Sequence, residues 1–153
     1  MRFEQYQFLK EKALELCNKE GLALPNPRLL NPVILAYIGD IVFSMYVRLR
    51  LLPTSGHVRI IHEFGAKMVS AVMQAKAMNA ILEDLTEEEA YIAKRGRNTK
   101  SHVPKSASVI EYRQGTAFEA LLGWLFLSDK YDRLELLLDK SFIVIRDEMK
   151  KKK

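Results

Sequence analysis

Cysteine is nearly absent from the sequence, and its scarcity excludes two kinds of structure. Cys17 is the only one, so the chain can form neither an internal disulfide nor a zinc site built from several thiolates. The first residues, Met1 to Gln5, also lack the basic-then-apolar order of a secretory signal. These absences predict a protein that works in a reducing cytoplasm.

Long hydrophobic runs and strand patterns are missing as well. The longest apolar run, from Pro32 to Val47, is interrupted by Asp40 and falls short of the ~20 residues that a membrane span needs. No segment has the alternation of apolar and polar residues that is typical of a half-buried strand. The sequence therefore predicts neither a membrane protein nor a β-sheet protein.

Basic residues, by contrast, are in excess. The chain has 24 lysines and arginines against 19 acidic residues, which gives a formal net charge of +5. Such a balance favours a polyanionic partner, either nucleic acid or an anionic membrane surface. The length of 153 residues, 48% of them hydrophobic, is sufficient for one domain with a sizeable core.

Helical periodicity runs through almost the whole chain and predicts an all-α fold. A first amphipathic segment stops at Gly21, and two prolines follow it. We therefore expect residues 1–27 to form an N-terminal helical extension, residues 28–149 the main domain and residues 150–153 a basic tail.

Two helices of the main domain should be central, because they are apolar on nearly all sides. They run from Pro32 to about Leu52 and from Val109 to Ser128. Between them the pattern predicts one long helix from His57 to Leu82 and a shorter helix that opens with the capping box at residues 86–89. The polar, basic stretch from Arg97 to Ser108 should be a loop.

Two acidic residues interrupt the central helices. Asp40 and Glu119 each lie among apolar neighbours, and an unpaired buried carboxylate costs several kcal/mol. Gly39 and Gly123 lie close to them, and glycine inside a helix costs about 1 kcal/mol relative to alanine. Glycine at these positions suggests that the two helices cross closely and bring the carboxylates together.

The two acids have two possible explanations. Each could form an ion pair with a basic residue such as Arg48 or Arg113. Alternatively, the pair could bind a hard cation, and carboxylate oxygens suit magnesium (Mg2+), which keeps much of its water shell and accepts only one or two protein ligands.

Four blocks of residues, within residues 30–129, surround these acids. They are Leu35-Ala36-Tyr37-Ile38-Gly39-Asp40 with Tyr46-Val47-Arg48, then Lys94-Arg95-Gly96-Arg97-Asn98-Thr99-Lys100-Ser101, then Pro104-Lys105 with Tyr112-Arg113, and finally Thr116-Ala117-Phe118-Glu119-Ala120-Leu121-Leu122-Gly123. In sequence and in order, these four blocks resemble the Mini-ribonuclease III family.

The resemblance implies a specific fold and activity. The family has the ribonuclease III catalytic fold, an all-helical homodimer without a separate domain for binding double-stranded RNA. Asp40 and Glu119 would then bind magnesium and position the water that attacks the phosphodiester, and the two subunits would each cut one strand. The biological substrate implied for a bacterial member is the precursor of large-subunit (23S) ribosomal RNA.

The chain departs from the longer ribonuclease III pattern at three positions. That pattern has acidic residues where this chain has Val33, Ala36 and Thr116, so a full two-metal site is in doubt. Tyr37 matches an aromatic residue that packs across the dimer interface in the larger enzymes, although it could equally be an ordinary core aromatic.

The predicted loop and its borders would supply the contacts to RNA. An RNA duplex is recognised mainly by its shape, through phosphate and 2′-hydroxyl groups. Arg113 could contact RNA or pair with a core acid, and a simple solvated loop is the alternative for the rest. The candidate RNA-binding residues are Arg95, Arg97, Asn98, Lys100, Lys105 and Arg113, and Lys94 and His102 add to the same polar segment.

Two other functions compete with a magnesium-dependent nuclease. One is a catalytically weak relative that only binds structured RNA, which the presence of both Asp40 and Glu119 disfavours. The other is a helical DNA-binding or protein-interaction domain, which is disfavoured because no short turn joins two helices into a helix-turn-helix with a basic recognition face.

Overall fold

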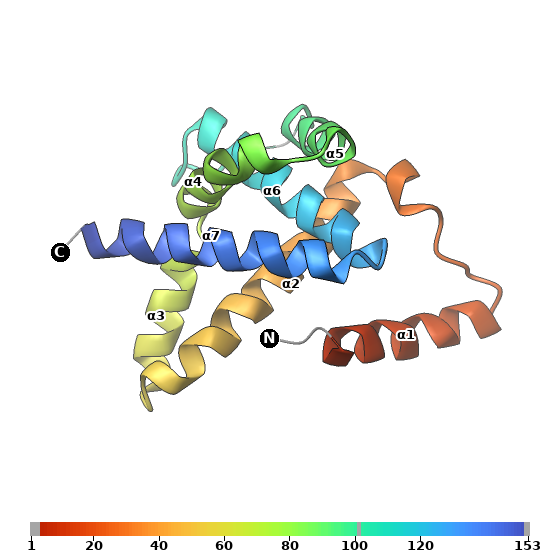
Figure 1. Ribbon diagram of the computed structural model, residues 1–153, viewed down its shortest axis with the longest axis horizontal. Helices are drawn as coiled ribbons and strands as arrows, with labels where there is room; N and C mark the ends of the chain where they lie inside the picture. Colours follow the sequence, from red (N-terminus) through yellow and green to blue (C-terminus); the bar gives the residue numbers. More distant parts are fainter. Residues whose placement is uncertain (1–3, 101, 152–153) are drawn as a thin grey trace.

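The computed structural model describes residues 4–100 and 102–151 (Figure 1). Ser101 of the predicted RNA-binding segment, the first three residues of the predicted extension and the last two of the predicted tail lie outside the described residues. The described part contains no strand, which confirms the all-α prediction. Its helices are α1 Glu4–Lys19, η1 Pro27–Leu29, α2 Pro32–Leu51, η2 Leu52–Thr54, α3 Val58–Met68, α4 Ala71–Ile81, η3 Leu82–Asp84, α5 Glu87–Arg97, α6 Val109–Leu127 and α7 Tyr131–Lys151.

Polar side chains fix where the helices of the main domain begin. The Asn31 side-chain oxygen accepts a hydrogen bond from the Val33 N–H at 2.9 Å, and Pro32 occupies the first turn of α2. Thr86 and Glu89 form the predicted capping box at the start of α5. The Ser108 hydroxyl caps α6 by accepting a hydrogen bond from the Glu111 N–H at 3.1 Å, so the predicted loop before it ends at that residue.

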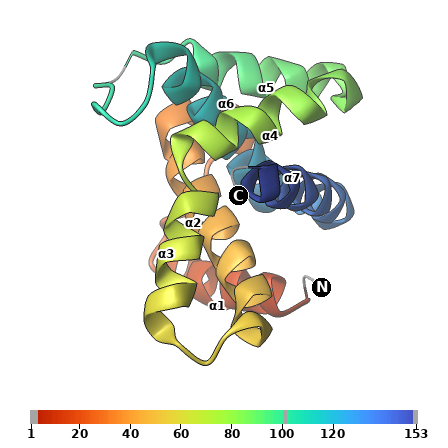
Figure 2. The same ribbon diagram turned by 90° about the vertical axis from the view of Figure 1, so that its left-hand side faces the viewer.

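The predicted long helix from His57 to Leu82 is wrong, because the structure divides it into α3 and α4. α3 ends at Met68, and the Ser70 hydroxyl accepts a hydrogen bond from the Met73 N–H at 3.4 Å to cap α4. A serine hydroxyl offers the backbone an alternative to continuing the helix, which is why it can start a new one. Figure 2 shows α3 running beside the second half of α2, away from the layer formed by α4, α5 and α6.

α2 and α6 cross in the middle of the molecule, and the other main-domain helices surround them (Figure 1). The rings of Phe43 on α2 and Phe118 on α6 meet edge to face, with centroids 5.0 Å apart. α7 is joined to α2 by the Tyr46 hydroxyl, which donates to Asp139, and by Arg50, which donates to the same carboxylate at 2.7 Å. The crossing is therefore the centre of the core.

α2 is not buried on all sides, contrary to the expectation from its composition. Four apolar residues on one face stay open to solvent in the single chain, and Tyr37 is 67% exposed. We call this face the α2 stripe, and its residues are Val33, Ile34, Tyr37 and Ile41. By length and composition alone the segment from Pro32 to Thr54 could cross a membrane, but a core helix passes the same test and the opposite face of α2 packs on α6.

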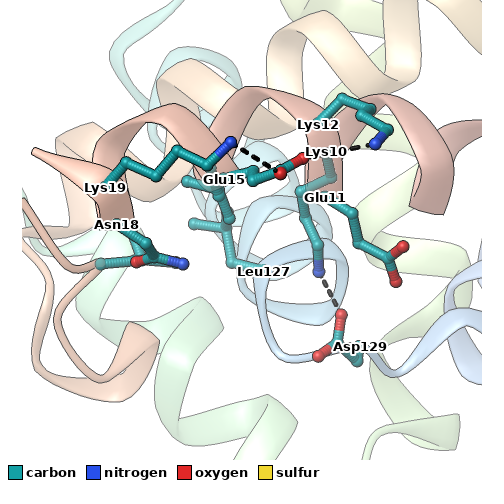
Figure 3. Close-up of a pocket in the computed structure, with 10 residues that line it drawn as sticks. Lys10, Glu11, Lys12, Glu15, Asn18, Lys19, Leu127 and Asp129 are labelled. Atoms are coloured by element: carbon teal, nitrogen blue, oxygen red, sulfur yellow. Dashed lines mark hydrogen bonds and ion pairs between the residues drawn. The ribbon is translucent and has the colours of Figure 1, made fainter.

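α1 ends at Lys19, and Gly21, two residues later, has a φ of 76°, in the left-handed region that favours glycine. Lys10 connects α1 to the turn between α6 and α7. Its ammonium group forms an ion pair with Asp129 (Figure 3). It also donates to the Phe126 carbonyl at 3.1 Å and lies 5.3 and 5.1 Å from the ring centroids of Phe126 and Tyr131. A hollow of about 700 Å³ separates the rest of α1 from this turn.

Candidate active site

Backbone contact between α2 and α6 brings Asp40 and Glu119 together. A Cβ atom at Gly39 would overlap the Glu119 carbonyl, lying 2.6 Å from its carbon, and a Cβ atom at Gly123 would lie 2.8 Å from the Leu35 carbonyl carbon. Only glycine lets the two main chains approach this closely. The prediction that these glycines mark a close helix crossing is therefore confirmed.

Each acid lies directly beside a crossing glycine. Asp40 follows Gly39 in α2, and Glu119 precedes Gly123 by one turn of α6. The two groups interact, since the charge of Asp40 helps to raise the pKa of Glu119. The site is thus assembled from two helices whose separation is fixed by contact between their backbones.

Burial raises the pKa of both carboxyl groups, and a different neighbour opposes the shift in each case. The pKa of Glu119 rises to about 7, mainly because the group is buried and secondarily because of Asp40, while a hydrogen bond from Gln74 opposes the shift. The pKa of Asp40 is also raised by partial burial, and the charge of Arg48 opposes that shift. Both acids therefore lie where an additional positive charge would be favourable.

Asp40 lies at the surface, whereas the sequence suggested that both acids are in the core. Asp40 is exposed to solvent, and Glu119 is half-buried. The apolar neighbours of Asp40 in sequence belong partly to the α2 stripe, which is itself open to solvent in the single chain. The site therefore opens outward through Asp40, with Glu119 behind it.

Neither acid is neutralised by a direct ion pair. Across the described ranges 4–100 and 102–151, Asp40 and Glu119 belong to none of the ion pairs within 4.0 Å. Arg48 is near enough to lower the pKa of Asp40, but one of its guanidinium nitrogens points to the Ser44 carbonyl, at 3.4 Å. Arg113 is exposed on α6.

The donor set of the site is small and consists of oxygen atoms. Within the described residues, no group of three or more histidine, cysteine, aspartate or glutamate side chains lies close enough to hold an ion. Val33 is exposed in the α2 stripe, and the Thr116 hydroxyl donates to the Tyr112 carbonyl within its own helix. Two carboxylates with space for water suit magnesium, which retains much of its hydration.

Gln74, on α4, is a neighbour of the site that the sequence reasoning missed. Its residue is only 3% exposed, and its side chain hydrogen-bonds Glu119. The only sign in the sequence is a single amide among apolar residues of a helix, which by itself does not indicate a site. The contact comes from the division of α3 from α4 at Ser70, which the sequence reasoning also missed.

The predicted RNA-binding residues fall into two groups. Arg95 on α5 donates to the carbonyl oxygens of Arg28 at 2.7 Å and Leu30 at 3.1 Å, so it holds η1 and the chain before α2. The remaining predicted residues are exposed, within or beside the segment between α5 and α6: Arg97, Asn98, Lys100, Lys105 and Arg113. Lys94 and His102 are exposed as well.

Known proteins resemble this chain over most of its length. The Ribonuclease III domain family matches residues 34–130. A Mini-ribonuclease 3 of Thermoanaerobacter sp. (strain X514) is 41% identical over 135 residues, covering 87% of this chain and 92% of the relative. One from Staphylococcus aureus (strain NCTC 8325 / PS 47) is 40% identical over 124 residues, covering 78% and 92%.

A solved structure supports the fold. An X-ray crystal structure of a Fusobacterium nucleatum protein superposes with a TM-score of 0.71 at 27% identity, and the match covers 76% of this chain and 96% of the other. Sequence and fold thus agree with the grouping that the residues around Asp40 and Glu119 suggested. The chain belongs to the ribonuclease III family, in its Mini-ribonuclease 3 group, and is an endoribonuclease.

Proposed function

We propose that the chain cleaves double-stranded RNA in a magnesium-dependent reaction at Asp40 and Glu119. The observation that carries the proposal is the proximity of these two carboxyl groups at the crossing of α2 and α6, where neither forms an ion pair within 4.0 Å with another described residue. A structural ion pair would place a cationic side chain against such acids. Their position instead favours a bound cation facing solvent and substrate.

Asp40 and Glu119 would hold the magnesium ion, which when bound activates a water molecule and stabilises charge on the phosphate. Asp40, being exposed, lies on the side from which RNA approaches, and Glu119 supports the site from behind. Because the pKa of Glu119 is about 7 without a cation, a cation would keep this group ionised at neutral pH. The backbone contact at Gly39 and Gly123 fixes the separation of the two helices that carry these acids.

The exposed segment between α5 and α6 would hold the RNA. Arg97, Lys100 and Lys105 offer cationic donors to phosphate groups, and Asn98 adds an amide. Arg113 extends this surface onto α6, six residues before Glu119. Arg95 contributes indirectly, because its guanidinium group is used to hold η1.

A second copy of the chain would cover the α2 stripe. Four apolar side chains on one helix face, including Tyr37 at 67% exposure, suit a self-complementary interface. Two copies would give two sites, one for each RNA strand. We expect Tyr37→Asp to convert a dimer into a monomer in light scattering, and a wild-type chain that is monomeric at micromolar concentration would contradict this arrangement.

The biological substrate that we infer is the precursor of large-subunit (23S) ribosomal RNA, processed in the cytoplasm. Support comes from the similarity to Mini-ribonuclease 3 proteins over most of the chain. Incubation with a precursor transcript should give a few discrete products, whereas uniform degradation would contradict this substrate.

Cleavage of a long RNA duplex tests the proposed chemistry. We expect magnesium to support cleavage, EDTA to stop it, and both Asp40→Asn and Glu119→Gln to abolish it while duplex binding remains. Glu63→Gln is the matched control, because this acid is exposed on α3 and pairs only with Arg59 there. Cleavage in EDTA would refute the mechanism, and binding without cleavage by the wild type would favour an RNA-binding protein.

A further inference from the structure

Gln74 is a buried amide whose side chain reaches from α4 to the active-site helix. Few polar side chains in the described part of the chain are so enclosed, and this one is 3% exposed. A buried amide must find hydrogen-bond partners to offset the loss of water. The location of those partners indicates what the side chain does.

One partner of Gln74 is the backbone where α3 ends. The Nε2 atom donates to the Val69 carbonyl at 3.2 Å, next to the Ser70 cap that starts α4. This carbonyl precedes a new helix and is fixed by the break between the two helices. Gln74 is therefore anchored to a rigid point outside α6.

The second point of contact is α6 itself. A Cβ atom at Gly115 would lie 2.9 Å from Gln74 Oε1, so the amide lies directly against the α6 backbone there. Glu119 is four residues further along and on the same face of α6. The Gln74 amide is also close enough to Glu119 to lower the pKa of its carboxyl group, and an amide NH₂ has two hydrogens, enough for the Val69 carbonyl and this carboxyl group.

We propose that Gln74 is a positioning residue of the active site, which links the Glu119 carboxylate to the Val69 carbonyl and so holds it in the orientation that binds the metal ion. The side chain does not reach substrate and acts only through Glu119. The absence of a side chain at Gly115 makes the space in which this amide lies. This inference rests on the proposed function, because it assumes that Glu119 binds the cation.

Gln74→Met tests this role, because methionine keeps nearly the same volume and removes the donors. Mn²⁺, which can be followed by electron paramagnetic resonance without RNA, is the probe for the metal site. We expect Gln74→Met to weaken Mn²⁺ binding by about 10- to 100-fold, the usual cost of losing a residue that orients a ligand. In magnesium, kcat should fall similarly while KM for the duplex stays unchanged.

Gln114→Met is the matched control, since this amide on α6 donates to Asn79 at 2.8 Å in an exposed contact. It should leave Mn²⁺ affinity and kcat unchanged. If Gln74 acts only through Glu119, Gln74→Met should cause no further loss in a Glu119→Gln background. Should Gln74→Met fold poorly, Gln74→Asn keeps the amide but is too short to reach both acceptors, and the same losses are expected.

The outcomes separate this role from a structural one. A folded Gln74→Met or Gln74→Asn variant with wild-type Mn²⁺ affinity would overturn the inference, even if its melting temperature fell. If the Asp40→Asn variant binds Mn²⁺ as tightly as the wild type, the proposed metal site is refuted, and this inference with it. Loss of binding in Asp40→Asn together with full binding in Gln74→Met would refute the inference alone.

Discussion

The α2–α6 crossing and the α1 attachment join helices in opposite ways. At the crossing, glycines on both helices place backbone against backbone, and large buried side chains surround the contact. α1 is joined to the turn after α6 through the polar contacts of Lys10, while Phe8, Leu9 and Leu16 remain largely exposed. One junction depends on shape and the other on the polar contacts of a side chain.

This difference determines how each junction responds to change. Backbone atoms in contact cannot move apart without shifting whole helices, so the crossing should tolerate no added atom. A lysine with a carbonyl, a carboxylate and two rings around it can be lost without disturbing the main domain. The crossing should therefore control global stability, and the α1 attachment only local order.

The largest expected effect comes from adding one methyl group at the crossing. Gly39→Ala should destabilise the protein by more than about 3 kcal/mol, because the new Cβ atom meets backbone that cannot yield. Urea denaturation of purified protein measures this loss. Gly56→Ala is the control, since a Cβ atom there meets nothing within 4 Å, and equal stability of the two variants would show that the crossing is not close.

The next largest effect is expected from the ionisation of Glu119, which should lower the stability of the fold at the helix crossing. The pKa of Glu119 is about 7 in the folded chain, against an ordinary value of 4.5. Between these values the folded state holds a proton that the unfolded state has lost, so the contribution of Glu119 to stability in EDTA is fully present below about pH 4.5 and is lost as pH rises through 7. The raised pKa corresponds to about 3 kcal/mol lost at pH 8.

Glu119→Gln should recover most of that loss at pH 8 and make unfolding less dependent on pH. Urea denaturation of both proteins at pH 5 and pH 8, in EDTA, measures the change. Glu63→Gln, which alters an exposed acid on α3, should leave the pH dependence as it is. A wild-type stability that rises relative to Glu119→Gln between pH 5 and pH 8 would contradict the expected direction.

The smallest effect is expected at α1. Lys10→Met removes an ammonium group whose side chain is 9% exposed and has several polar partners, and it should cost about 1 kcal/mol or less, confined to α1. Hydrogen exchange should speed up in α1 and stay unchanged in α2 and α6. Lys12→Met, at a side chain 63% exposed, is the control, and faster exchange in α6 would mean that α1 supports the whole fold.

Much of the fold could be predicted from the sequence because its signals are local. Asn31, Thr86 and Ser108 cap helices within three residues of themselves, so their effect does not depend on the rest of the chain. Gly39 and Gly123 indicated a close approach because glycine inside a helix needs a reason.

What could not be predicted depends on contacts distant in sequence or on an ambiguous signal. Ser70 divides a stretch that reads as one helix, because a serine within a helical pattern is compatible with either outcome. The link from Gln74 to Glu119 spans two helices and follows from that division. The exposure of Asp40 and the use of Arg95 to hold η1 likewise depend on which surfaces the folded chain covers.

Contact between the peptide groups of Gly39 and Glu119 has a consequence for how this site could be altered. The two main chains are already in contact at Gly39, so repacking the core cannot bring the helices that carry Asp40 and Glu119 closer together at this point. Substitutions can only widen the gap or change the length of the side chains that cross it. Adapting the proposed metal site to an ion of another radius would therefore require changes in the acids themselves, such as Asp40→Glu, rather than repacking of the core.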